Sequence, residues 1–150
     1  MATHFNGSPE EKQALDTYIK LLRATETVST RIHRHLAETD LTVSQFGVLE
    51  ALLHLGPLCQ RDIGRKILRS GGNMTLVIDN LEKRGLVERC RGEEDRRFIE
   101  VRLTPAGQEL IEQVFPRHAQ TVKQAFTALS EVEQQELSRL CRTLGLANRG

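Results

Sequence analysis

The feature that most constrains the fold is a single β-hairpin pattern within an otherwise helical chain. Residues 98–103 alternate Phe, Glu and Arg with Ile, Val and Leu, and residues 86–91 form a second run typical of a strand. Between them, residues 92–97 read Gly-Glu-Glu-Asp-Arg-Arg, a charged turn. Such alternation indicates strands with one buried and one exposed face. We therefore expect two antiparallel strands joined by a polar tip.

Helix-start signals divide the chain before the hairpin into four helices. The first begins at the capping box of Ser8 and Glu11, with Pro9 at the first helical position, and continues for about 28 residues. That length is unusual in a small monomer and suggests that a partner subunit buries part of its apolar face. The other three helices are expected over residues 42–56, 60–68 and 70–84, with a very short strand at 58–59.

Two more helices follow the hairpin. Thr104-Pro105 begins a long one, in which Pro116 predicts a kink or a local break near Phe115. Ser130 and Glu133 form the capping box of the last helix.

Three short helices followed by a hairpin is the winged helix-turn-helix arrangement. We expect a mainly α fold with a small β-hairpin wing, in one domain over residues 1–150. Its winged helix-turn-helix core lies at about 40–104, and the long helices at about 9–38 and 105–147 mediate dimerisation.

Composition fits a soluble cytoplasmic protein better than a membrane or secreted one. No apolar run approaches the roughly 20 residues of a membrane span, and the N-terminus lacks a secretion signal. The three cysteines are widely spaced, which favours free thiols in a reducing compartment. The net charge is only +1, but residues 61–102 hold 11 basic and 8 acidic side chains. Positive charge thus gathers in the middle of the chain, a modest sign of nucleic-acid binding.

Small and polar residues gather at the start of the helix predicted at 70–84. Each glycine inside a helix start costs up to ~1 kcal/mol relative to alanine, so a cap alone does not explain two of them. Short side chains let backbone amides approach phosphates, Asn73 can pair with an adenine edge, and Thr75 can reach a phosphate or a thymine methyl. We expect this helix to enter a major groove. Its predicted DNA contacts are Ser70, Gly72, Asn73, Thr75 and Leu76.

Basic residues on two neighbouring segments complete the predicted surface. Arg61, Arg65 and Lys66 can contact phosphates, with solvated surface charge as the alternative for each. Arg96 and Arg97 at the hairpin tip suit the negative potential of a narrow minor groove. Asp95 is expected to hold an arginine or the turn through a charge-assisted bond; the alternative is an ordinary charged hairpin.

Three segments of this surface resemble the MarR family (multiple-antibiotic-resistance regulators). Residues 74–89 read MTLVIDNLEKRGLVER and carry the pattern D-x-L-x-x-x-G-L-V. Residues 95–97 match the D-x-R of the wing, and residues 103–107 match L-T-x-x-G. The resemblance implies a dimeric repressor or activator with interleaved terminal helices. It also implies an effector pocket between these helices and the winged helix-turn-helix core at about 40–104, here called the reading head. By the same motifs, Thr75 matches the recognition-helix threonine, and Asp95 and Arg97 match the wing pair.

The sequence does not identify an effector. Members of the family respond to phenolic compounds, oxidants or metals, and the peroxide-sensing subgroup uses a cysteine near the start of the first helix, where this chain has none. Oxidation at Cys59 or Cys90 could disturb DNA binding, with idle thiols there and at Cys141 as the alternative. We expect a small-molecule effector rather than a metal, and no cofactor. The histidines are predicted to be separate: His33 and His35 lie two apart on different helix faces, and His54 and His118 are lone.

Two other classes of function fit the sequence less well. An enzyme is disfavoured because the chain has no phosphate-binding glycine loop, no H-E-x-x-H and no G-x-S-x-G motif. A winged helix that contacts protein should expose aromatic or apolar anchors on its fourth helix, and this one exposes Gly, Asn and Thr beside arginines. We therefore expect a sequence-specific DNA-binding regulator that acts as a homodimer on a pseudo-palindromic operator.

Overall fold

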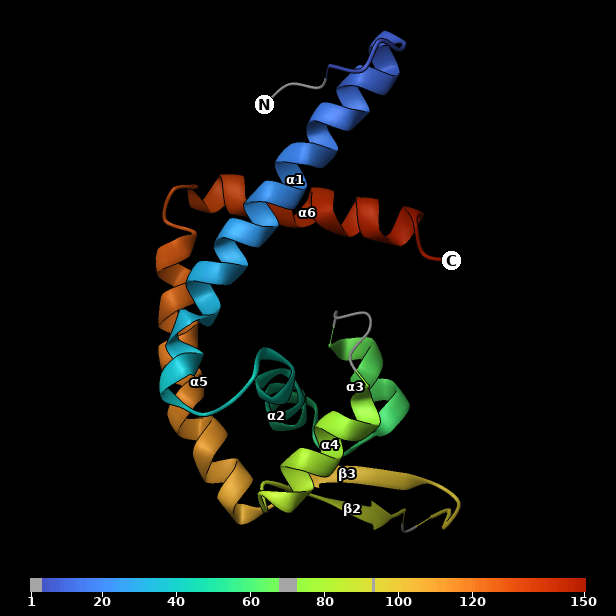
Figure 1. The fold of residues 1–150 in the computed structure, drawn as a ribbon, viewed down its shortest axis with the longest axis vertical. Helices are drawn as coiled ribbons and strands as arrows, with labels where there is room; N and C mark the ends of the chain where they lie inside the picture. Colours follow the sequence, from blue (N-terminus) through green and yellow to red (C-terminus); the bar gives the residue numbers. More distant parts are fainter. Residues whose placement is uncertain (1–3, 68–72, 93) are drawn as a thin grey trace. The chain divides into compact units, whose positions relative to one another are not determined.

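Helices form most of the chain, and one small sheet accompanies them, with the strand Val87–Arg91 next to the helix Met74–Lys83 (Figure 1). The computed structural model describes residues 4–67, 73–92 and 94–150. In chain order the elements are α1 (Pro9–His33), the 3-10 helix η1 (Arg34–Glu38), α2 (Val43–Leu55), β1 (Leu58–Cys59), α3 (Gln60–Lys66), α4 (Met74–Lys83), β2 (Val87–Arg91), β3 (Ile99–Leu103), α5 (Pro105–Ala125) and α6 (Glu131–Ala147). They form two compact units, His33–His118 and the remainder of the chain on both sides of it.

A three-stranded antiparallel sheet forms the base of the unit His33–His118. Its strand order is β1-β3-β2, so that β3 lies in the centre. The register pairs Val101 of β3 with Leu58 on one side and with Arg89 on the other. The predicted hairpin is therefore confirmed, and each strand begins one residue later than expected.

The core of this unit is formed by the sheet, by helices α2, α3 and α4, and by the first half of α5. Residues spaced three or four apart on each helix face inward, as the periodicity predicted, and meet Val101 of the sheet, which is fully buried. Each large side chain buried in this way contributes about 1.5–3 kcal/mol to stability. The fully buried helical members are Phe46, Val48, Leu49, Ile63, Ile78, Leu81 and Ile111.

Local hydrogen bonds fix the predicted helix starts. Ser8 Oγ accepts from the Glu11 amide and the Glu11 carboxylate accepts from the Ser8 amide, both at 3.1 Å. The same reciprocal pattern opens α2 at Thr42 and α6 at Ser130. These bonds satisfy amides that have no partner within the helix, which explains why a capping box in the sequence is a dependable start signal.

Of the two alternatives expected near Phe115, the local break was wrong, because α5 continues through Pro116, and the kink stays a prediction. A proline within a helix removes the amide that would bond to the carbonyl four residues earlier, here that of Glu112. Both Pro116 and Glu112 are exposed, so water can satisfy the carbonyl that loses its partner. Because water can replace the lost hydrogen bond to the Glu112 carbonyl, the helix is not interrupted.

The second unit contains α1 up to Ile32, the end of α5 from Ala119, and α6. Helix α6 is exposed along its whole length in the single chain. Its exposed apolar residues are Val132, Leu137, Leu140, Leu144 and Leu146. Among the described residues, no helix combines the length and apolar character that a membrane span requires.

Candidate nucleic-acid interface

Helix α4 has one buried and one exposed face. Ile78 and Leu81 are fully buried, whereas Thr75 and Leu76 are exposed, Leu76 at 55%. The helix begins at Met74 with Asn73 as its N-cap, so the predicted start with Ser70 as the cap was wrong. Of the predicted contacts, Ser70 and Gly72 lie outside the described residues, and the others share the exposed face.

Asn73 is exposed and also caps the N-terminus of α4. Its Oδ1 accepts a hydrogen bond from the Leu76 amide at 3.3 Å. A bidentate contact with adenine uses both the oxygen and the nitrogen of the carboxamide. The cap already uses the oxygen, so Nδ2 is the atom that remains for a donor contact.

Gln60 joins α3 to the exposed face of α4, and the sequence analysis did not identify it. Its Nε2 donates a hydrogen bond of 2.6 Å to Thr75 Oγ1. Gln60 is the first residue of α3 and Thr75 is the second residue of α4. A polar side chain at the start of the first helix of the pair was the only sequence signal for this contact.

Arg89 fixes α4 against the wing and was also missed. Its guanidinium lies 2.7 Å from the Asp79 carboxylate and 3.0 Å from that of Glu82, and the Arg89 amide donates to Glu82 at 3.0 Å. The side chain of Arg89 is only 22% exposed. A charged residue at an inward-facing position of the β2 alternation was the available signal, because such a position needs a partner.

At the wing, the Asp95 carboxylate holds the guanidinium of Arg97 in a two-pronged contact. Arg97 Nε and Nη2 donate to Oδ1 and Oδ2 at 3.2 and 3.1 Å, and the Arg97 amide donates to Oδ1 at 3.0 Å. These bonds hold the pKa of the Asp95 carboxyl below its usual value. The Arg97 side chain is still 91% exposed, so the fork orients it without covering it.

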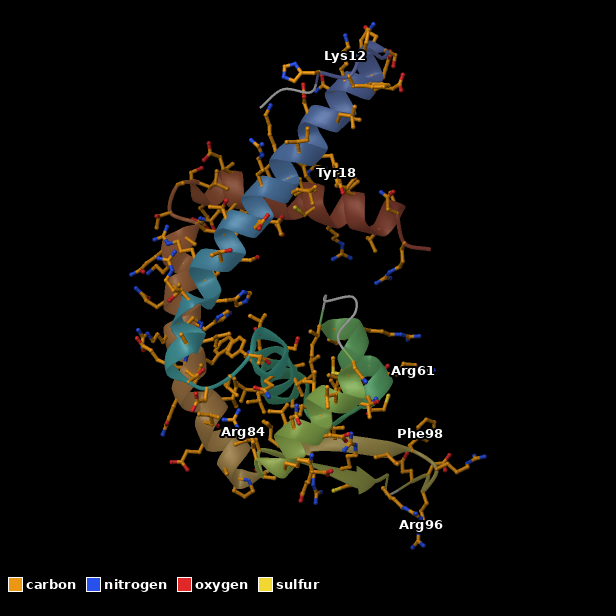
Figure 2. The ribbon with its side chains drawn as sticks, in the orientation of Figure 1. Lys12, Tyr18, Arg61, Arg84, Arg96 and Phe98 are labelled. Atoms are coloured by element: carbon orange, nitrogen blue, oxygen red, sulfur yellow. The ribbon has the colours of Figure 1, made fainter. Side chains whose placement is uncertain are left out.

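The remaining basic candidates are also exposed. Arg96 and Phe98 project from opposite sides of the hairpin end in Figure 2, and Arg61 projects from α3. Arg65 and Lys66 are exposed on the same helix. The structure therefore places basic side chains on the wing and on α3, in the same unit as α4.

Three of the histidines, His33, His35 and His118, form a cluster around the His118 ring. His35, which is 7% exposed, lies with its Nε2 3.2 Å from His118 Nδ1, and the rings of His33 and His118 stack with centroids 6.4 Å apart. The expectation that His118 is lone was wrong, because the contacts that join it to His33 and His35 cross between elements and no spacing within one helix predicts them. Among the residues that the structure describes, no group of His, Cys, Asp and Glu has the arrangement of a metal site.

Cys59 and Cys90 lie on one face of the sheet. Both pair with Glu100 of the central strand, from opposite sides. Two strand spacings separate their backbones by roughly 10 Å, beyond the reach of a disulfide. Both are free thiols, as is Cys141 on α6.

Comparison with known proteins identifies the arrangement. The family model described as MarR family matches residues 41–99. The HTH-type transcriptional regulator YkoM of Bacillus subtilis is 34% identical over 146 residues, which cover 97% of this chain and 94% of YkoM.

Two solved structures have the same fold. BpsR of Bordetella bronchiseptica, whose DNA binding is regulated by 6-hydroxynicotinic acid, superposes with a TM-score of 0.76 at 27% identity, covering 87% of this chain and 98% of BpsR. A cysteine-to-serine mutant of MarR from Escherichia coli, complexed with operator DNA, superposes with a TM-score of 0.77 at 22% identity, covering 91% of this chain and 99% of the other. With its winged helix and a relative that matches almost its whole length, the chain belongs to the MarR family, whose members are transcription regulators and not enzymes.

Proposed function

We propose that this protein is a sequence-specific, ligand-responsive repressor that binds a pseudo-palindromic operator as a homodimer in the cytoplasm. The observation that carries the proposal is the pairing of an exposed polar helix face with an oriented arginine on the wing. Thr75 and Leu76 lie on that face, and Arg97 is held by Asp95 while remaining 91% exposed.

The contacts follow from groove dimensions. A major groove admits an α-helix, so the exposed face of α4 reads base edges there through Asn73, Thr75 and Leu76. Arg97 enters the adjacent minor groove, whose negative potential attracts a guanidinium. Because Asp95 already orients this side chain, less conformational entropy is lost on binding. Arg61 and Arg65 of α3 bind phosphates, which adds affinity without sequence information.

A homodimer accounts for the exposed apolar surface of the second unit. Tyr18 and Leu22 of α1 are 57% and 49% exposed, and Leu140 and Leu144 of α6 are 49% and 51% exposed. A single chain gains little by leaving such residues in water, whereas a second copy would bury them. Two reading heads then meet successive major grooves about 34 Å apart on a two-fold symmetric site.

Ligand response is proposed from the family. DNA binding by the related BpsR is regulated by 6-hydroxynicotinic acid. In this protein an organic effector would act by binding better to a dimer whose reading heads do not match the groove spacing, which lowers operator affinity. A panel of small aromatic acids and phenols, added to the protein–operator complex, tests for release.

The decisive experiment is fluorescence anisotropy with a labelled fragment from upstream of the protein's own gene, compared with a scrambled fragment at several salt concentrations. We expect nanomolar, selective binding. The logarithm of the association constant should fall linearly with the logarithm of the salt concentration. Absence of binding even at low salt would favour a winged helix that contacts protein. Light scattering should give twice the 17.0 kDa chain mass, and a monomer at micromolar concentration would refute the dimer.

A further inference from the structure

One side-chain hydrogen bond joins the two helices of the helix-turn-helix at the exposed surface. It runs from Gln60 Nε2 to Thr75 Oγ1 and is 2.6 Å long, although 15 positions separate the two residues. Thr75 lies in the first turn of α4, the end of the helix that meets the base edges. A short contact of this kind restricts the rotation of both side chains.

The bond also determines the direction of the Thr75 hydroxyl proton. A hydroxyl has one proton to donate and two lone pairs that accept, whereas an amide nitrogen only donates. Because Gln60 Nε2 is the donor, Thr75 Oγ1 is the acceptor. The hydroxyl proton therefore points away from Gln60 and is available to another acceptor.

We infer that Gln60 is a specificity-determining residue of the DNA interface, because it occupies one of the two lone pairs of the Thr75 hydroxyl and so favours that hydroxyl as a donor to a keto base, guanine or thymine, in the major groove. This inference rests on the proposed function, since it needs α4 to lie in that groove. Guanine O6 and thymine O4 are acceptors there, and the amino groups of adenine and cytosine are donors, so a contact at these exocyclic groups separates the two classes of base, whereas the N7 acceptor of both purines does not. With one lone pair occupied by Gln60, the hydroxyl donates its proton to a keto oxygen, whereas it can accept from an amino group only through the one lone pair that remains.

Gln60 acts as a positioning residue in this scheme. It reaches the base only through Thr75, and its loss leaves the Thr75 hydroxyl in place but free to rotate. A hydroxyl with both lone pairs open accepts from an amino base more readily, so its preference for keto bases weakens. The signature of Gln60 is therefore a change in base preference and not merely a loss of affinity.

The test compares base preferences of the wild type with those of Gln60→Ala, Gln60→Glu and Thr75→Val. Affinity selection from a random double-stranded DNA library, followed by sequencing, gives the preferred operator of each. Anisotropy titrations with each of the four base pairs at the contacted position then measure the preference. Gln113→Ala is the matched control, because Gln113 is an exposed glutamine on α5 of the same unit.

We expect the wild type and the control to prefer a keto base by about 3- to 10-fold, the effect of one hydrogen bond. Gln60→Ala and Thr75→Val should reduce this preference to less than about 2-fold. Gln60→Glu should reverse it, because a carboxylate only accepts and must take the Thr75 proton. The hydroxyl then offers only lone pairs to DNA and favours an amino base.

Other outcomes overturn the inference. A loss of affinity that is equal for all four base pairs in Gln60→Ala would show that Thr75 contacts a phosphate or that Gln60 is only structural. Unchanged preferences in a selective protein would refute the inference and leave the proposed function intact. A wild type that selects no sequence would refute both. Thermal unfolding of each variant establishes that it is folded. If Gln60→Ala does not fold, Thr75→Val provides the test, because Thr75 is exposed.

Discussion

His35 and His118 lie 3.2 Å apart between Nε2 and Nδ1, although 83 positions separate them in the chain. The Phe46 ring packs against both, with centroids 6.0 Å from His35 and 4.6 Å from His118. Burial and the nearby Arg117 lower the pKa of His35, and burial with the charges of His35 and His33 lowers the pKa of His118 to about 4. The folded protein therefore holds this pair neutral at pH 7.

Acidification should destabilise the fold through this pair. The pKa of His118 is lower in the folded chain than the 6.5 of an unperturbed histidine, so between pH 6.5 and 4 the unfolded chain binds more protons. Stability is thus complete above pH 6.5 and is lost as the pH falls. Allowing for partial solvent screening, we expect a loss of ~1–2 kcal/mol in the free energy of unfolding by pH 4.5. Urea unfolding at pH 7.5, 6.0 and 4.5 measures it.

A variant assigns this loss to the pair. His118→Gln keeps a neutral hydrogen-bonding side chain that does not titrate, so its stability should depend less on pH. His4, which is exposed near the N-terminus, supplies the control His4→Gln, whose profile should match that of the wild type. Equal pH dependence in all three proteins would remove the pair from the explanation.

Local signals in the sequence predicted most of the fold. Capping boxes at Ser8, Thr42 and Ser130 work through bonds between residues three apart, so they can be identified without tertiary structure. Strict alternation predicted β3, whose Val101 is buried as expected, although Ile99 at the hairpin end of the same face is 53% exposed. The start of α4 was misplaced because both Ser70 and Asn73 are good N-caps and nothing local decides between them.

The missed interactions depend on tertiary contacts. The hydrogen bonds of Gln60 with Thr75 and of His35 with His118 cross between elements, so no spacing rule within one helix predicts them. The hydrogen bonds between the Arg97 guanidinium and the Asp95 carboxylate could be predicted from the sequence, because the two residues lie two positions apart in one turn. Short-range chemistry could therefore be inferred from the sequence, whereas the partners set by packing could not.

Replacement of Arg97 should weaken operator binding without unfolding the protein. The side chain is 91% exposed, so Arg97→Ala removes little packing, but it removes the arginine proposed for the minor groove. We expect affinity to fall about 5- to 30-fold and the dependence of binding on salt to weaken by about one counterion. Asp95→Asn, which keeps Arg97 but loosens its orientation, should cost only a few-fold in anisotropy titrations. Unchanged affinity in Arg97→Ala would exclude the wing from the interface.

Removal of Arg89 should destabilise the reading head. Arg89→Leu leaves the carboxylates of Asp79 and Glu82 facing each other without their shared cation, at a site where Arg89 is 22% exposed. We expect a loss of about 1–3 kcal/mol in the free energy of unfolding. The matched control is Arg102→Leu on the neighbouring strand, where the ion pair with Glu88 is 52% and 45% exposed and contributes about 0–1 kcal/mol. Equal effects of the two substitutions in urea unfolding would contradict the role assigned to Arg89.

The start of α5 should tolerate only glycine at position 107. A Cβ on Gly107 would lie 1.9 Å from the carbonyl oxygen of Leu86, and that oxygen already accepts a hydrogen bond from the Thr104 amide at 3.1 Å. Backbone cannot give way as a flexible side chain can, so Gly107→Ala must separate α5 from the strand region and should cost about 2–4 kcal/mol. Gly64→Ala is the control, because a Cβ at Gly64 of α3 meets nothing within 4 Å and should be neutral or stabilising by up to ~1 kcal/mol. Thermal and urea unfolding measure both, and a Gly107→Ala protein as stable as the wild type would show that α5 is not held against Leu86.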